Sequence, residues 1–342
     1  MQKLILLFCL FILPVFVSAQ IVNIPDSIFK AYLVGNTAIN TNGDGEIQVT
    51  EASAFTGTIG VSSPGISDLT GIEAFTALTV LWCYKNSLTS LDVSNNTALT
   101  DLGCSSNLLT SLDVSQNTAL TTLNCWGNSL TGLDVTNNTA LTILGCDNNS
   151  LTSLDVSNNT ALTVLSCQYN SLTSLDVTQN TALTELYCST NPLATLDVSQ
   201  NTALTDLYCW GNYLTALDIR NGNNVNITGF NAKKNANLYC ISVDNTAYSN
   251  ANWSLDKDSW AVYSNNCTVG IEDHQLSQPI ITTANTITIA GTGTAGIYNL
   301  LGKEVAKASL PATIRIKESG VYLVRVETEG RVVTRKVLLS NR

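Results

Sequence analysis

Apolar positions recur with a fixed period through the middle of the chain. The frame LTxLxCxxNxLTxLDVxxNTA repeats seven times between Leu78 and Asn224 without an insertion. In the first half of each unit, leucine and cysteine alternate with variable residues, which is the period of a short strand with one face inside. A partial unit precedes the array from Leu69, and a degenerate unit follows from Val225 to about Asp244, as expected of capping repeats. The pattern predicts stacked coils whose strands form one parallel sheet.

Each unit also contains a polar turn and a return limb. The asparagine after the predicted strand, Asn86 in the first unit, can hydrogen-bond buried backbone groups, and repetition stacks these side chains into a ladder. The second half, LTSLDVSNNTA in the first unit, repeats the spacing with more polar residues. A unit of 21 residues is too short for a full helix, so we expect extended or turn structure there.

The pattern LxxLxCxxN strongly resembles the leucine-rich repeat family over residues 66–244, with cysteine where family members usually have leucine. The resemblance implies a curved solenoid with a parallel sheet along one side. It also implies that ligands commonly contact that sheet.

The N-terminal residues resemble a secretory signal. Lys3 is followed by an apolar run from Leu4 to Val17 and by the small-residue site Val17-Ser18-Ala19. This run falls short of the ~20 apolar residues that a membrane-spanning helix needs. We therefore expect cleavage near Gln20 and no transmembrane segment in the mature chain.

The segment after the signal predicts a helix capped by Asp26, followed by a loop rich in oxygen ligands. The loop from Asn40 to Glu51 resembles an EF-hand calcium loop, with asparagine where the family usually has aspartate at the first position. The resemblance implies calcium as a cofactor, bound by Asn40, Asn42, Asp44, the carbonyl of Glu46, and Glu51. The alternative is a glycine-rich turn that needs no metal.

Alternating strands replace the repeat from about Ser277, and they predict a small β-sandwich. Residues 297–305, 319–326 and the basic ending 335–339 resemble the type A sorting domain of the bacterial type IX secretion system. The resemblance implies a Bacteroidota source, the secretion machinery as a partner, and a secreted or outer-membrane surface location. The alternative is an ordinary binding sandwich.

We therefore expect a mainly β chain with five segments. They are a signal peptide (1–19), a short helical N-terminal cap with the EF-hand-like loop (20–65), a leucine-rich repeat solenoid with a parallel sheet (66–244), a C-terminal cap and linker (245–276), and a β-sandwich sorting domain (277–342).

The cysteines divide into two kinds. Those of the repeats lie in register on strands ~4.8 Å apart, whereas a relaxed disulfide brings Cβ atoms to ~3.8 Å. We expect them to be buried free thiols, because no histidine or CxxC pair accompanies them to form a metal site. They are Cys83, Cys104, Cys125, Cys146, Cys167, Cys188 and Cys209. Cys240 and Cys267 lie outside this ladder, and we predict a disulfide between them that closes the end of the solenoid.

The variable positions of the repeat predict a binding surface. Counting from the leucine that opens each unit, positions three, five, seven and eight vary, and alternation directs three and five outward. Aromatic and acidic residues gather there: Trp82, Tyr84, Asp101, Trp126, Asp147, Tyr169, Glu185, Tyr187, Asp206, Tyr208 and Trp210. Exposed aromatics beside acids suit recognition of protein or glycan. The alternative is that the aromatics only cover neighbouring coils.

Charge and chemistry exclude several classes of function. The net charge is −10, so nucleic acid is a poor partner. The single histidine, His274, lies in the predicted linker, and the acids of the repeat recur because the repeat recurs, so we do not expect an enzyme. The sequence predicts a secreted or cell-surface binding protein. The alternatives are a structural surface or adhesion protein without a specific ligand and, from the threonine ladder that includes Thr79, Thr100, Thr121 and Thr142, an ice-binding protein.

Overall fold

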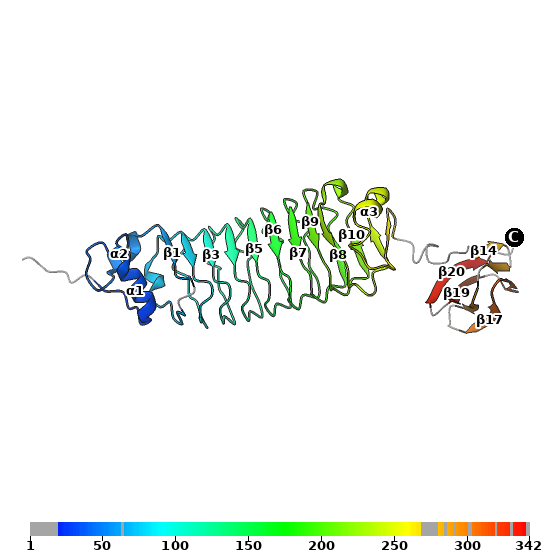
Figure 1. The fold of residues 1–342 in the computed structure, drawn as a ribbon, viewed down its shortest axis with the longest axis horizontal. Helices are drawn as coiled ribbons and strands as arrows, with labels where there is room; N and C mark the ends of the chain where they lie inside the picture. Colours follow the sequence, from blue (N-terminus) through cyan, green and yellow to red (C-terminus); the bar gives the residue numbers. More distant parts are fainter. Residues whose placement is uncertain are drawn as a thin grey trace, which may run out of the picture. The chain divides into compact units, whose positions relative to one another are not determined.

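The computed structural model describes residues 20–62, 65–267, 280–283, 286–290, 292–299, 303–318, 320–328 and 331–339. The predicted signal peptide and the part of the predicted linker after Cys267 lie outside them. The chain forms two compact units, of which the first ends at Asn265 and the second begins at Asn266 (Figure 1). No helix in the described part of the chain is long and apolar enough to span a bilayer.

The first unit is a solenoid with a nine-stranded parallel sheet, which confirms the predicted fold class. Its strands pair in strict register, so the central leucines Leu81 and Leu102 lie side by side, as do Leu102 and Leu123. The strands are β1 (Thr58–Gly60), β2 (Val80–Trp82), β3 (Asp101–Gly103), β4 (Thr122–Asn124), β5 (Ile143–Gly145), β6 (Val164–Ser166), β7 (Glu185–Tyr187), β9 (Asp206–Tyr208) and β11 (Gly229–Asn231). The sheet begins at Thr58, inside the segment expected to be the N-terminal cap.

The return limb adopts both of the conformations expected for it. In the coils of β2 to β6 it contains turns and no described strand. In the last coils it forms a second parallel sheet of four strands: β8 (Thr195–Asp197), β10 (Ala216–Asp218), β12 (Cys240–Ser242) and β13 (Val262–Ser264). The coils therefore continue past Asp244, where the sequence predicted that they end.

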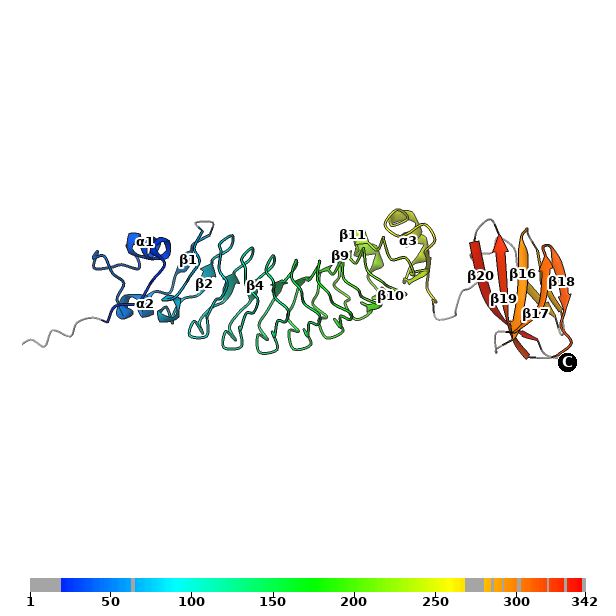
Figure 2. The same ribbon diagram turned by 90° about the horizontal axis from the view of Figure 1, so that it is seen from below.

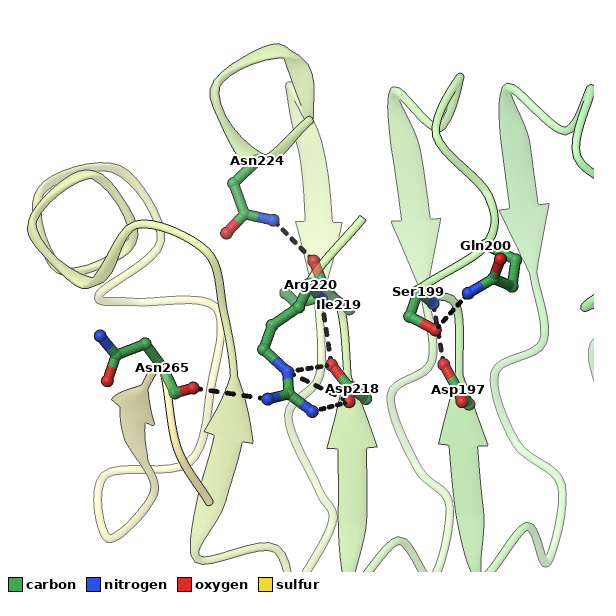
Figure 3. A network of polar contacts seen from close by, with 8 residues as sticks. All are labelled: Asp197, Ser199, Gln200, Asp218, Ile219, Arg220, Asn224 and Asn265. Atoms are coloured by element: carbon green, nitrogen blue, oxygen red, sulfur yellow. Dashed lines mark hydrogen bonds and ion pairs between the residues drawn. The ribbon is translucent and has the colours of Figure 1, made fainter. Parts of the chain in front are cut away.

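Polar contacts organise this return limb (Figure 3). Asp197 Oδ1 accepts a hydrogen bond from Ser199 N (2.8 Å), and the same turn recurs in earlier coils, where Asp113 Oδ1 accepts from Ser115 N (2.8 Å). In the last coils Asp218 forms an ion pair with Arg220. The ladder aspartates thus close turns of the backbone.

Short helices cover the two ends of the solenoid (Figure 2). At the N-terminal end are α1 (Ser27–Gly35), α2 (Val49–Ala54) and the 3₁₀ helix η1 (Ile72–Ala74); at the C-terminal end are the 3₁₀ helix η2 (Asn224–Asn226) and α3 (Thr246–Asn252). Asp26 caps α1 as predicted, accepting from Ile28 N (2.9 Å) and Phe29 N (3.0 Å). At the other end Trp253 packs against Phe230, with 4.8 Å between ring centroids. Cys240 and Cys267 are both disulfide-bonded.

The interior of the solenoid consists of ladders of identical residues. The seven repeat cysteines are buried free thiols, as the sequence predicted. Burial raises the pKa of Cys104 to about 12, so these thiols stay protonated at neutral pH and pack as small apolar groups.

The asparagine after each strand ties neighbouring coils together. Asn128 Nδ2 donates to Cys125 O in its own coil (2.9 Å) and to Cys104 O in the preceding coil (3.1 Å). Asn128 Oδ1 accepts from Leu109 N of the preceding coil (3.0 Å). This is the predicted ladder, and it satisfies backbone groups that the turn removes from water.

A second asparagine ladder, which the repeat pattern did not predict, lies on the return limb. Asn138 is fully buried, and its Nδ2 donates to Val114 O and Asn117 O of the preceding coil (both 2.9 Å). The same two contacts recur at Asn117, Asn159, Asn180 and Asn201.

The second unit contains two antiparallel sheets around one core, in agreement with the predicted sandwich. One sheet has β14 (Ile280–Thr283), β15 (Thr286–Ile289) and β18 (Ala312–Arg315), and the other has β16 (Thr294–Asn299), β17 (Glu304–Ser309), β19 (Gly320–Thr328) and β20 (Arg331–Leu339). Ile287, Ile289, Ile297 and Val324 are fully buried between them.

We expect Asn138→Ala to lower the free energy of unfolding by about 2 kcal/mol, because two buried hydrogen bonds between coils are lost. Urea denaturation followed by circular dichroism measures the change. The control is Asn137→Ala, because Asn137 is exposed and makes only a 3.5 Å contact with Ser115 O. Equal stability of the two variants would contradict the ladder's role.

Candidate ligand-binding face

The repeat directs four side chains of each coil to one surface. Positions three and five flank the buried leucine of the strand and point outward. Position eight has a left-handed backbone in each coil from β2 to β11, with φ between 51° and 70°: Lys85, Ser106, Gly127, Asn148, Tyr169, Thr190, Gly211 and Lys234. Its N–H donates to the carbonyl of position seven in the next coil, as from Tyr169 N to Ser189 O (3.0 Å). Side chains at positions seven and eight therefore form columns beside the sheet.

Four aromatic residues occupy these two columns in alternate coils. Tyr84, Trp126, Tyr169 and Trp210 stand at the exits of β2, β4, β6 and β9, and we call them the aromatic row. With strands ~4.8 Å apart, neighbouring positions of the row are roughly 10 Å apart along the solenoid. Tyr84, Trp126 and Tyr169 are 38%, 40% and 44% exposed. The coils between them carry small or polar residues in the same columns: Ser105 and Ser106, Asp147 and Asn148, and Ser189 and Thr190.

The C-terminal end of the row is braced by ring contacts. Tyr169 and Trp210 meet edge to face with centroids 6.0 Å apart, and Lys234 Nζ lies 5.1 Å from the centroid of Trp210. Lys234 belongs to the degenerate coil after the seven regular units, where the sequence pattern was too weak to align it.

Position five contributes Trp82 at one end of the sheet and the stacked pair Tyr187 and Tyr208 at the other, with 5.4 Å between the tyrosine centroids. Tyr187 Oη donates to Glu185 Oε2 (2.9 Å). Burial, together with this bond and the negative charge of Glu185, raises the pKa of Tyr187 to about 12. Tyr187 is therefore a neutral, oriented hydroxyl at any physiological pH.

Glycines at position five accommodate large side chains from the preceding coil. A Cβ atom on Gly145 would lie 2.6 Å from Asn124 Oδ1, and one on Gly103 would lie 3.2 Å from Trp82 Cδ1. Side chains on this face thus lean toward the next coil. The alternation of small and large residues at position five can be seen in the sequence. Only the in-register pairing of the strands shows that each glycine lies beside the larger side chain of the preceding coil.

The predicted acids have different roles. Asp147 Oδ1 accepts from Ser166 Oγ (2.5 Å) and Gln168 N (2.9 Å), so it braces the coil rather than facing a ligand. Asp206 Oδ2 accepts from Thr205 Oγ1 (2.8 Å). Asp101, at position three of its repeat unit and the first residue of β3, is half-buried. It lies on a different coil from the stacked pair Tyr187 and Tyr208.

The threonine ladder is part of the coil-to-coil bonding. Thr121 Oγ1 donates to Thr100 O and Thr142 Oγ1 donates to Thr121 O, both at 3.0 Å. Because these hydroxyl protons are donated to backbone carbonyls, they are not available to order water, which argues against an ice-binding array.

The EF-hand-like loop is closed by its own hydrogen bonds. Asn42 Nδ2 and Gln48 Nε2 each donate to Asp44 Oδ2 at 3.0 Å. Glu51 Oε1 accepts from Thr41 N (2.8 Å) and Asn42 N (3.2 Å), and Glu51 Oε2 accepts from Gln48 N (3.1 Å) as a capping box for α2.

These contacts decide how calcium could fit the loop. Burial raises the pKa of Glu51, but the hydrogen bonds onto its carboxylate lower it by more, so it is ionised at neutral pH. Asn40 Oδ1 accepts from Gly43 N (3.0 Å), and Glu46 pairs with Lys30 (2.7 Å). The oxygen set suits calcium, but the two amide nitrogens facing Asp44 would have to turn away before a cation could take their place.

The fold has clear relatives among solved structures. An internalin (inlF) from Listeria monocytogenes matches with a TM-score of 0.52 and 18% identity, over 70% of this chain and 76% of that chain. Internalin C2 (inlC2) from the same species matches with a TM-score of 0.52 and 19% identity, over 64% and 93%. These similarities show the leucine-rich repeat fold. No protein-family model matches the chain, and no curated protein matches it in sequence.

Calcium binding at the loop predicts that the melting temperature in calcium exceeds that in chelator, and that Glu51→Gln removes the difference because it takes away the predicted bidentate ligand. Differential scanning fluorimetry measures both. Glu73→Gln, outside the loop, is the control. Identical melting of the unaltered protein in calcium and chelator would contradict a metal site and leave the loop as a hydrogen-bonded turn.

Proposed function

We propose that this protein recognises an extracellular protein or glycan through the outward face of its nine-stranded sheet. The aromatic row is the observation that carries this proposal. Three of its four rings are about two-fifths exposed, although burial is favourable for residues of this size. Large rigid aromatics aligned on one surface provide contact area at low entropic cost on binding.

The rest of the face supports the same proposal. Trp82, 40% exposed, and the Tyr187–Tyr208 stack extend the aromatic surface onto the strands. The stacking of Tyr187 on Tyr208 shows that some of these rings pack against neighbouring coils. Trp82 and Trp126, in contrast, are each 40% exposed. The alternative, a structural or adhesion protein without a specific ligand, gives these rings no role beyond packing.

Catalysis has little support in the described residues. The aspartates of the repeat close turns, and the hydrogen bonds from Ser115 lower the pKa of Asp113 below its ordinary value. A general acid needs the opposite shift. His274 lies outside the described residues, and no group of three or more His, Cys, Asp or Glu side chains among them could hold a metal ion.

We also propose export by the type IX secretion system, with the second unit as its sorting domain. Strand β16 and the long hairpin of β19 and β20 contain much of the sequence that resembles the type A domain. The proposal implies a Bacteroidota source and a secreted or outer-membrane surface location.

Replacing Trp126 and Trp210 by alanine together should abolish ligand capture while leaving the melting temperature within a few degrees of the unaltered protein. The measurement is a glycan and surface-protein array probed with the full-length mature chain. Tyr239→Ala is the control, because Tyr239 is 52% exposed but directly precedes β12 of the return limb. Unchanged capture, or silence of the unaltered protein across the array, would favour the structural alternative.

Deleting residues 277–342 should leave the protein in the periplasm of its host, since the signal peptide would still direct passage across the inner membrane. Immunoblots of cell fractions measure its location, and the full chain with Tyr239→Ala is the control. Normal appearance of the truncated chain outside the cell would contradict the sorting role.

A further inference from the structure

The gap between Tyr169 and Trp210 differs from the other gaps in the aromatic row. The coil of β7 supplies Ser189 and Thr190 there, and Thr190 N donates to Trp210 O (2.8 Å). Tyr169 comes from the coil before and Trp210 from the coil after, yet their ring centroids are only 6.0 Å apart. The two rings therefore lean toward each other across the coil of Ser189.

Two buried hydroxyl groups in this gap have no hydrogen-bond partner. Ser189 is fully buried, and neither its Oγ nor Thr190 Oγ1 has a partner among the described residues. The only other unpartnered buried side-chain atoms in the described part of the chain are amide oxygens of the return-limb asparagine ladder. Those recur with the repeat, whereas this pair of hydroxyls occurs in one coil.

Another serine at position seven shows that the repeat does not require an unpaired hydroxyl at that position. Ser105 occupies the equivalent place in the coil of β3, and its Oγ donates to Asn124 O of the next coil (3.2 Å). Ser189 lacks the equivalent bond. Thr190 is also a β-branched residue with φ at 56°, a conformation such residues rarely adopt. The left-handed conformation recurs at position eight of the repeat, but a β-branched residue in it and a pair of unpaired buried hydroxyls occur together in this one coil, which is typical of a site rather than of a scaffold.

The chemistry of the gap indicates its ligand. Hydroxyls that can both donate and accept, placed between aromatic rings, match a sugar ring, whose C–H face packs on an aromatic while its hydroxyls form hydrogen bonds. The roughly 10 Å spacing of the row is comparable to a disaccharide unit of an extended glycan chain. Lys234 holds Trp210 from the far side, so Tyr169 is the ring left to turn outward.

We propose that the aromatic row binds a linear glycan, with one sugar inserted between Tyr169 and Trp210 and hydrogen-bonded by Ser189 and Thr190. This inference rests on the proposed recognition function and names its ligand class. Tyr169 swings from Trp210 on binding, and the sugar hydroxyls then satisfy Ser189 Oγ and Thr190 Oγ1.

The test compares Ser189→Ala with Ser105→Ala in the full-length mature chain. Removing an unpartnered hydroxyl should leave the melting temperature equal or higher, whereas removing the bonded Ser105 hydroxyl should lower it. A printed array of bacterial, plant and animal glycans identifies a bound glycan, and isothermal titration with that glycan measures affinity. We expect Ser189→Ala to weaken binding at least tenfold and Ser105→Ala to change it less than twofold.

The outcomes separate this inference from the proposed function. Glycan binding that survives Ser189→Ala, or an equal loss of stability in both variants, overturns the inserted sugar while recognition by the face stands. Silence on the glycan array with capture of a surface protein that needs Trp126 also overturns the inference and leaves the proposed function. Silence on both arrays overturns both.

Discussion

The structure depends on the pairing of buried backbone groups between neighbouring coils. Stacking the coils places backbone carbonyls and amides in an interior without water, where each needs a hydrogen-bond partner, often in the coil before or after it. The asparagine after each strand meets this requirement: the amide of Asn128 serves two cysteine carbonyls and a leucine N–H. Because the partner lies in the adjacent coil, the strands must pair in register, and the unbroken 21-residue period of the seven regular units meets this requirement.

This constraint also separates structure from function along the repeat. The ladder of thiols, leucines and asparagines is fixed, and on the sheet and at its exit the chemical variety lies at positions three, five, seven and eight. The left-handed residue at position eight places its side chain in a column beside position seven in each coil from β2 to β11. Side chains in these columns are therefore evenly spaced along the solenoid. Because aromatic residues occupy them in alternate coils, they form the aromatic row. A departure from this regularity, such as the unpaired Ser189 hydroxyl, is therefore informative.

Much of this organisation was predictable from sequence because a repeat supplies its own comparison. Periodicity predicted the strands, the thiol ladder, the first asparagine ladder and the outward residues. It missed the second ladder, although the position of Asn138 is asparagine in six units while that of Asn137 is asparagine or glutamine; the burial of Asn138 shows the reason. It placed the ends of the solenoid too close together, because the coils of β1 and β13 lack the repeat motif. Side-chain pairing was also out of reach: the bracing of Asp147 by Ser166 and the contact of Lys234 with Trp210 depend on how coils stack.

Photo-cross-linking can identify the surface of the solenoid that a ligand contacts. A photoreactive phenylalanine analogue at Trp126 or at Tyr239 in the full chain, irradiated with native cell-surface material, reports which side a ligand touches. Recognition by the outward face predicts a discrete adduct from Trp126 and none from Tyr239. Adducts from Tyr239 alone, or the same adducts from both positions, would contradict it.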